Sequence, residues 1–263
     1  MSDTLHLVRL VFDRRALARV ASRHRLPRNL DDGYLLHAGL AQLFATSDEP
    51  ASVPLSSFAV DETHAAAVQR PDDLFVLGYA QESAAVLEAR MGAARSSLLR
   101  LARSTDVPEF ASGQRVEFRS RVCPVVRTRK PGVLGIEQGT DRRGKPKARE
   151  LDAFVHATIG VPRETVVSRE AVYVDWLRAQ FEAPNGAKGE QPTGAHLEDA
   201  RLVEFRRERT HRRESPATME RPNALMEGTL TVTDPAAFRT LLARGVGRHR
   251  AFGFGMLLLR PAR

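Results

Sequence analysis

The alternation of apolar and polar residues over positions 1–110 predicts a mixed unit of sheet and helix. Strands are expected where β-branched and aromatic residues cluster or alternate with polar ones, over 5–12, 53–60 and 73–80. Helices are expected where apolar residues recur at helical spacing, over 14–24, 33–45 and 83–102. The order strand-helix-strand-strand-helix makes up most of a ferredoxin-like unit.

The same patterns predict a second unit of this kind over residues 111–263. Extended segments are expected over 114–127, 202–213, 224–233 and from 257 onward. Helices are expected over 151–159, 169–182 and 235–244, the last with Asp234 as its cap and Pro235 at its first position. We therefore predict an α+β protein of two tandem ferredoxin-like (RRM-like) domains, residues 1–110 and 111–263.

A glycine-rich loop precedes the last predicted strand. Four glycines fall within eleven residues and enclose three consecutive basic side chains, and the candidate ligand-binding residues here are Gly245, Gly247, Arg248, His249, Arg250, Gly253 and Gly255. Glycine lets the backbone approach a ligand closely, and backbone N–H groups together with arginines can cradle a phosphate. The spacing matches neither common nucleotide-binding loop pattern. A plain turn before a core strand is the alternative, but the interleaved basic residues favour contact with a phosphate backbone.

The balance of charges indicates the class of partner. The 263 residues include 40 Lys and Arg against 32 Asp and Glu, and the net charge of +8 favours nucleic acid or another anionic surface. The single cysteine excludes an internal disulfide or a thiolate zinc site, and the histidines lack metal-ligand spacing, so we expect no metal and no cofactor. Without a signal-like N-terminus or a long apolar run, we expect a cytoplasmic protein with no membrane partner.

Two basic segments of the second half extend the candidate RNA surface. Each could be a solvated face, but Lys and Arg outnumber Asp and Glu in both, which favours tracking of a phosphate backbone. The first segment is a predicted hairpin with its tip at 141–145, and its candidates are Arg127, Arg129, Lys130, Arg142, Arg143, Lys145 and Lys147. The candidates of the second are Arg206, Arg207, Arg209, Arg212 and Arg213. Two ferredoxin-like units that share one basic surface suit RNA.

Several motifs resemble the Cascade-type CRISPR repeat endoribonucleases, the CasE family. The resemblance is most specific near the C-terminal end, in the segments Glu227–Val232, Leu241–Gly247 and Gly253–Leu257. The segment Val116–Thr128 is similar to the strand that opens the second domain of that family, and 141–145 is similar to a basic turn there. The segment Tyr34–Leu40 resembles the start of the first helix, Tyr-x-x-His-x-x-Leu.

The resemblance implies a tandem ferredoxin-like fold and metal-independent cleavage at the 3′ base of a CRISPR repeat RNA hairpin. It also implies that the mature crRNA stays bound within a surveillance complex, whose other subunits are partners. By matching position, His37 and Tyr34 would be the catalytic pair. Residues 13–30 and 183–222 are longer than the family pattern, which could mark a divergent branch such as the type IV (Csf) counterpart. Catalysis there could depend on arginines, with Arg23 as a candidate.

His37 also suits this chemistry on its own. Metal-independent RNA cleavage is attack of a 2′-OH on the adjacent phosphorus, which leaves a 2′,3′-cyclic phosphate and requires a proton acceptor. A histidine has a reference pKa of about 6.5, and Tyr34 lies three residues earlier on the same helix face. A histidine or tyrosine on an amphipathic helix is more often structural. Two other functions therefore stay open: a non-catalytic RNA-binding subunit of a ribonucleoprotein complex, and an RNA-recognition-motif regulator of messenger RNA.

Overall fold

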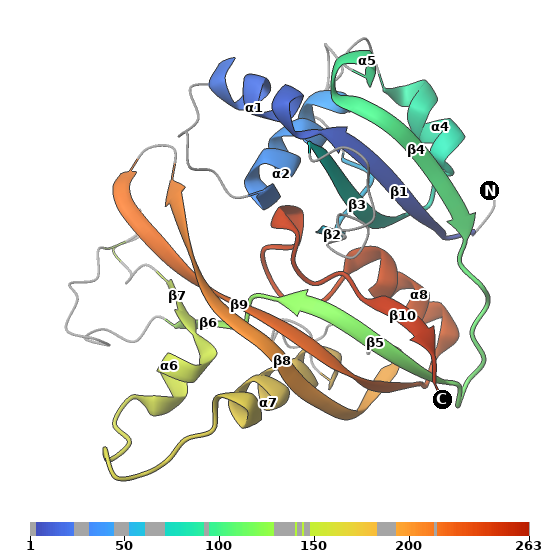
Figure 1. Ribbon diagram of the computed structural model, residues 1–263. Helices are drawn as coiled ribbons and strands as arrows, with labels where there is room; N and C mark the ends of the chain where they lie inside the picture. Colours follow the sequence, from blue (N-terminus) through green and yellow to red (C-terminus); the bar gives the residue numbers. More distant parts are fainter. Residues whose placement is uncertain are drawn as a thin grey trace.

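Four antiparallel strands form a sheet in the first half of the chain (Figure 1). Their order is β2-β3-β1-β4, and in that order they span Phe58–Val60, Asp73–Ala80, His6–Asp13 and Leu99–Asp106. The helices among the described residues of this half are α1 (Arg14–Arg23), α2 (Asp32–Leu43), α4 (Ala84–Arg90) and α5 (Arg95–Leu98). The computed structural model describes residues 4–23, 32–44, 53–60, 72–91, 95–128, 140, 144, 148–182, 193–212 and 215–262.

The second half repeats this topology. Its sheet has the order β10-β5-β9-β8, and in that order the strands span Leu258–Pro261, Arg115–Val122, Ser215–Val232 and Ala195–Arg212. When the four strands of each sheet are numbered in chain order, both sheets have the order fourth, first, third, second, which is the ferredoxin-like arrangement. Two helices, α7 (Arg169–Glu182) and α8 (Pro235–Arg244), complete the unit. The hairpin of β6 (Val125–Thr128) and β7 (Arg149–Asp152), followed by α6 (Ala153–Thr158), is inserted after β5. The predicted α+β fold of two ferredoxin-like units is confirmed.

Alternation along the central strands separates two packing surfaces. Val8, Leu10 and Phe12 of β1 are buried in one cluster with apolar residues of α1 and α2, because side chains two apart in a strand share a face. Tyr79 of β3 belongs instead to the cluster that contains the core of the second half. Its hydroxyl donates a buried hydrogen bond of 2.9 Å to the carbonyl oxygen of Leu257. The two halves therefore share a continuous apolar interface.

The predicted helix over 83–102 is wrong in its second part. The chain forms α4 and the short α5, and then becomes strand β4, which pairs with β1 from His6↔Asp106 to Phe12↔Leu99. Without β4, one edge of the central strand β1 would lack a backbone partner, and unpaired N–H and C=O groups are costly. Pairing with a distant strand thus overrides the local helical spacing. The result is the fourth strand that the sequence pattern lacked.

Other predicted boundaries differ less. The strand over 114–127 is divided at Cys123 and Pro124, where β5 pairs with β9 and β6 pairs with β7. Pro124 has no N–H to donate to a ladder. The strand over 53–60 forms only from Phe58. The elements predicted over 73–80, 169–182 and 235–244 are confirmed.

The hairpin of β8 and β9 is much longer than predicted. Each strand has 18 residues, and they pair from Ala195↔Val232 to Arg212↔Ser215. In Figure 1 the far part of this hairpin projects beyond the sheet as an arm, towards α2. Residues 202–212 and 224–232, which the sequence predicted as parts of two separate segments, therefore lie on one two-stranded ribbon.

Candidate functional site

Helix α2 places Tyr34 and His37 against the glycine-rich loop (residues 245–256). The centroid of the Phe252 ring, at the end of the single 3₁₀ turn η3 (Arg250–Phe252), lies 4.8 Å from that of His37 and 5.7 Å from that of Tyr34. The His249 ring lies 6.4 Å from the same centre. Tyr34 and His37 share a helix face at i, i+3 spacing. Phe252 thus links the candidate pair in the first half to the loop of the second.

The environment of His37 favours its neutral form. The side chain is half-buried, and the resulting desolvation lowers the pKa of His37 below its ordinary value of 6.5. A hydrogen bond to the backbone of Ala251 acts in the opposite direction but is the weaker influence. A neutral imidazole has one unprotonated ring nitrogen. His37 can therefore accept a proton near neutral pH, as a general base must.

The glycine-rich loop is a closed and anchored structure. Val246 N–H donates to the Gly255 carbonyl (2.8 Å), and Gly255 N–H donates to the carbonyl of Arg121 in β5 (2.7 Å). Gly255 has a φ of +81°, and a Cβ there would overlap the carbonyl oxygen of Val246. At Gly247, a Cβ would come within 2.8 Å of the ring of Trp176. Both glycines are required for close packing, which fixes the position of Phe252.

The basic side chains of the loop have carboxylate and carbonyl partners. Arg248 Nε donates to one oxygen of Glu150 in β7 (2.6 Å), and His249 Nε2 lies 2.7 Å from the other. These contacts, the His249 hydrogen bond first, lower the pKa of Glu150 to about 2. Arg250 donates to the carbonyl of Arg244 (3.2 Å). The predicted phosphate contacts of these three side chains stay a prediction: a phosphate would have to compete with Glu150 for Arg248 and His249, and with the Arg244 carbonyl for Arg250.

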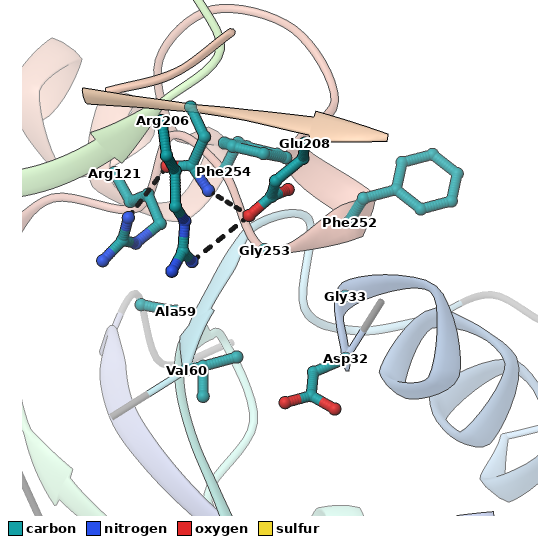
Figure 2. A pocket seen from close by; sticks show the side chains of 11 residues that line it. Asp32, Gly33, Ala59, Val60, Arg121, Arg206, Glu208, Phe252, Gly253 and Phe254 are labelled. Carbon is teal, nitrogen blue, oxygen red and sulfur yellow. Dashed lines mark hydrogen bonds and ion pairs between the residues drawn. The ribbon is translucent and has the colours of Figure 1, made fainter. Parts of the chain in front are cut away.

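A cavity of about 360 Å³ opens between α2, the glycine-rich loop and the β8–β9 hairpin. It is lined by Asp32, Gly33, Ala59, Val60, Arg121, Arg206, Glu208, Asn223, Phe252, Gly253 and Phe254. Figure 2 shows the polar side chains of β5 and β8 on one wall and Asp32 with Gly33 on the other. Phe252, which contacts His37, lies on its border, so the cavity lies next to the candidate catalytic residues.

The predicted basic run of β8 divides between two faces of the strand. Arg206 lines the cavity, where its Nη2 lies 3.2 Å from Glu208. Arg207 points to a second hollow, which is lined by Glu150 and Arg221 among others, and its Nη1 lies 3.7 Å from Glu220. Consecutive strand residues point to opposite faces. The structure therefore brings only part of this run to the site.

Of the candidates in the first basic segment, only Arg127 is among the described residues, and it does not line the cavity. Arg127 is exposed on β6, opposite Glu150 in the register. The backbones of Arg23, Arg209 and Arg212 lie in α1 and β8, but their side chains are outside the described residues. Also outside the described residues are Arg129, Lys130, Arg142, Arg143, Lys145, Lys147 and Arg213.

Sequence reasoning missed four residues at this site: Arg121, Asn223, Arg221 and Phe252. Arg121 and Asn223 join across the β5–β9 pair, where Arg121 Nη1 donates to Asn223 Oδ1 (2.8 Å). The Arg221 guanidinium lies 5.5 Å from the centre of the Phe252 ring, a cation–π distance. For Phe252 a signal was present, because it lies inside the glycine-rich loop that the sequence singled out. Arg121 looked like an ordinary outward residue of its predicted strand, and Arg221 and Asn223 lay just before the strand predicted over 224–233.

Two kinds of feature are missing from the part of the chain that the structure describes. No group of three or more His, Cys, Asp or Glu side chains there could hold a metal ion. No helix there is long and apolar enough to cross a membrane.

Comparisons with known proteins point to one family. The model of a family described as "CRISPR associated protein" matches residues 5–261. Among solved structures, the chain is similar to the Cas6e protein of Escherichia coli str. K-12, with a TM-score of 0.57 and 18% identity over 98% of this chain and 100% of that one. It is also similar to the CRISPR endoribonuclease Cse3 bound to 19-nucleotide RNA, with a TM-score of 0.59 and 19% identity over the same shares. A chain of a CRISPR RNA-guided surveillance complex has a TM-score of 0.53 and 17% identity, again over 98% and 100%. Curated proteins yielded no match.

Proposed function

The chain belongs to the CRISPR-associated protein family, and we propose that it is the endoribonuclease that processes CRISPR precursor RNA. It would bind the hairpin of each repeat and cleave at the 3′ base of the stem. It would then stay on the mature crRNA as a subunit of a surveillance complex. The fold, shared with an RNA-bound CRISPR endoribonuclease and with a chain of a surveillance complex, supports this proposal.

One observation carries the catalytic part of the proposal. His37, whose pKa is lowered by burial, lies against Phe252 beside a cavity that contains Arg121 and Arg206. A proton acceptor and cations are thus gathered between two halves of the chain. A purely structural histidine would not require a charged cavity next to it.

The chemistry we propose is internal transesterification without metal. His37 takes the proton of the 2′-OH as the 2′-oxygen attacks the adjacent phosphorus. The bond from phosphorus to the 5′-oxygen breaks and this oxygen takes a proton from water, so the products end in a 2′,3′-cyclic phosphate and a 5′-OH. Tyr34, on the same helix face, orients the ribose or the phosphate. The N–H groups and basic side chains of the glycine-rich loop stabilise charge on the phosphorane. In-line attack requires the scissile strand to bend away from the stem.

The test is cleavage of RNA transcribed from a CRISPR repeat array, with EDTA present throughout. The wild-type protein should release hairpin-ended fragments with a 2′,3′-cyclic phosphate. His37→Ala should bind the RNA almost normally and cleave about 10²–10⁴-fold more slowly, the usual worth of a general base. His156→Ala is the matched control, because His156 is an exposed histidine of α6 that does not line the cavity.

Two outcomes would contradict the proposal at different points. Full cleavage by His37→Ala would remove the assignment of the general base and leave the activity. Tight hairpin binding by a wild-type protein that never cleaves would instead identify a non-catalytic RNA-binding subunit. Preference for single-stranded RNA over the hairpin would favour an RNA-recognition-motif regulator.

A further inference from the structure

The cavity beside α2 contains a fully buried amide that joins a guanidinium to a carboxylate. Asn223 is 1% exposed, and its side-chain oxygen accepts a hydrogen bond from Arg121 Nη1 (2.8 Å). Its side-chain nitrogen donates to Glu208 Oε1. The same Glu208 oxygen lies 3.2 Å from Nη2 of Arg206. One carboxylate oxygen thus receives an amide donor and a guanidinium donor at once (Figure 2).

These donors match the needs of a phosphate oxygen as well as those of a carboxylate. A phosphate oxygen accepts charge-assisted hydrogen bonds from Arg, and a neutral amide N–H adds direction. Both guanidinium groups also face carboxylates: Arg121 Nη2 lies 3.5 Å from Glu204, and Arg206 faces Glu208. The Arg206 side chain is 48% exposed and that of Glu208 is 23% exposed. The Glu208 carboxylate can therefore leave for solvent without unfolding the strand.

We propose that Arg121, Arg206 and Asn223 form a subsite for a backbone phosphate of the RNA, and that Glu208 occupies this subsite until RNA displaces it. The proposal rests on the proposed function and names how that site holds its substrate. The cavity borders Gly33 of α2 and Phe252, so the bound phosphate lies near the cleaved bond. In the free protein the carboxylate holds Arg206 directly and Arg121 through Asn223, and it repels anions that cannot replace it.

Removing the negative charge of Glu208 should raise the affinity for RNA. Phosphate binding in the wild-type protein must break the contact between Arg206 and Glu208 and place the two anions close together. Glu208→Gln keeps the side-chain shape but removes this repulsion. RNA affinity should therefore rise about three- to tenfold, the size of a partly exposed charge interaction. Arg206→Gln should weaken binding and reduce the dependence of affinity on salt concentration.

The experiment measures the dissociation constant of a repeat-hairpin RNA with a 2′-deoxy nucleotide at the scissile position, which prevents cleavage. The matched control is Glu198→Gln, which changes the net charge equally and lies near the start of the same strand. Glu198 is paired with Arg115 through contacts of 2.7–3.1 Å and does not line the cavity. Glu208→Gln should bind more tightly than Glu198→Gln. In the Arg206→Gln background the Glu208→Gln substitution should give no gain: the double variant should bind the RNA no more tightly than Arg206→Gln alone.

Each result decides between distinct conclusions. Equal affinities of the two single variants, or weaker binding by Glu208→Gln, would overturn the subsite even if the wild-type protein cleaves the natural RNA. A gain that survives in the double variant would also overturn it, because the gain would not pass through Arg206. Tighter binding by Glu208→Gln, lost in the double variant, would support the subsite even if the wild-type protein never cleaves, in which case only the proposed activity fails.

Discussion

Gly255→Ala should lower the free energy of unfolding by about 3–6 kcal/mol. Gly255 has a φ of +81°, a region where a Cβ costs about 1–2 kcal/mol. The new Cβ would also overlap the carbonyl oxygen of Val246, so the two chain segments must separate. Overpacking of this kind costs about 1–3 kcal/mol. Separation also breaks the hydrogen bond from Val246 N–H to the Gly255 carbonyl (2.8 Å), worth about 1 kcal/mol.

Gly113→Ala is the control that isolates the steric part of this loss. Gly113 has nearly the same φ, +80°, but no heavy atom lies within 4 Å of the position of its Cβ. It should lose only the cost of the backbone conformation, about 1–2 kcal/mol.

Urea unfolding followed by far-UV circular dichroism gives both values, and fluorescence of Trp176, the only tryptophan, reports from beside the loop. Equal losses for the two variants, with unchanged m-values, would show that the loop relaxes freely and would refute the claim that its closed packing fixes Phe252.

Three further predictions concern charge and hydrogen bonding. Because burial lowers the pKa of His37, the single-turnover cleavage rate should rise with pH through a midpoint below 6.5, and a midpoint above 6.5 would contradict the neutral-base role. The pKa of Glu150 is about 2 in the folded protein against an ordinary 4.5, so its ion pairs contribute stability above pH 4.5 that disappears as pH falls towards 2. Glu150→Gln should therefore cost about 1–3 kcal/mol in urea unfolding at pH 7, with a smaller difference from wild type near pH 3, and a pH-independent difference would count against the ion pair. Tyr79→Phe leaves the buried Leu257 carbonyl without its donor and should cost about 1–2 kcal/mol, whereas Tyr34→Phe, on the half-buried face of α2, should cost less.

The two faces of β8 offer different basic side chains to a bound RNA. Arg206 and Glu208 face the cavity next to His37, while Arg207 faces the hollow that contains Glu150 and Arg221. A ligand in the cavity would therefore contact one set of side chains, and a ligand along the inserted hairpin would contact the other. Substitutions of Arg206 and Arg207 should have separable effects on RNA binding, although the residues are adjacent in sequence.

Local periodicity was sufficient for elements whose stability is mostly local or whose burial follows one face. The helix over 235–244 has an Asp cap, a proline at its first position and a glycine at its end, and it forms as predicted. The strand over 73–80 is central and apolar on both faces, and its bounds are also as predicted. The repeated order of elements was enough to predict two ferredoxin-like units. The spacing of Tyr34 and His37 was enough to place them on one helix face.

The rest depended on contacts between residues that are far apart in the sequence. Strand β4 forms because β1 needs a second partner, and no local signal in 99–106 records that need. Arg121, Arg206 and Asn223 come from three different strands, and only the register of β5, β9 and β8 brings them to one cavity. Glu150 meets His249 only after the loop and the inserted hairpin have folded onto each other. By itself the sequence determined most of the helices and the central strands, and which segments carry charge, but not β4 or the full length of the β8–β9 hairpin. The tertiary structure alone decided which charges neutralise one another and which face the site, because electrostatic interactions depend on distance and burial in three dimensions.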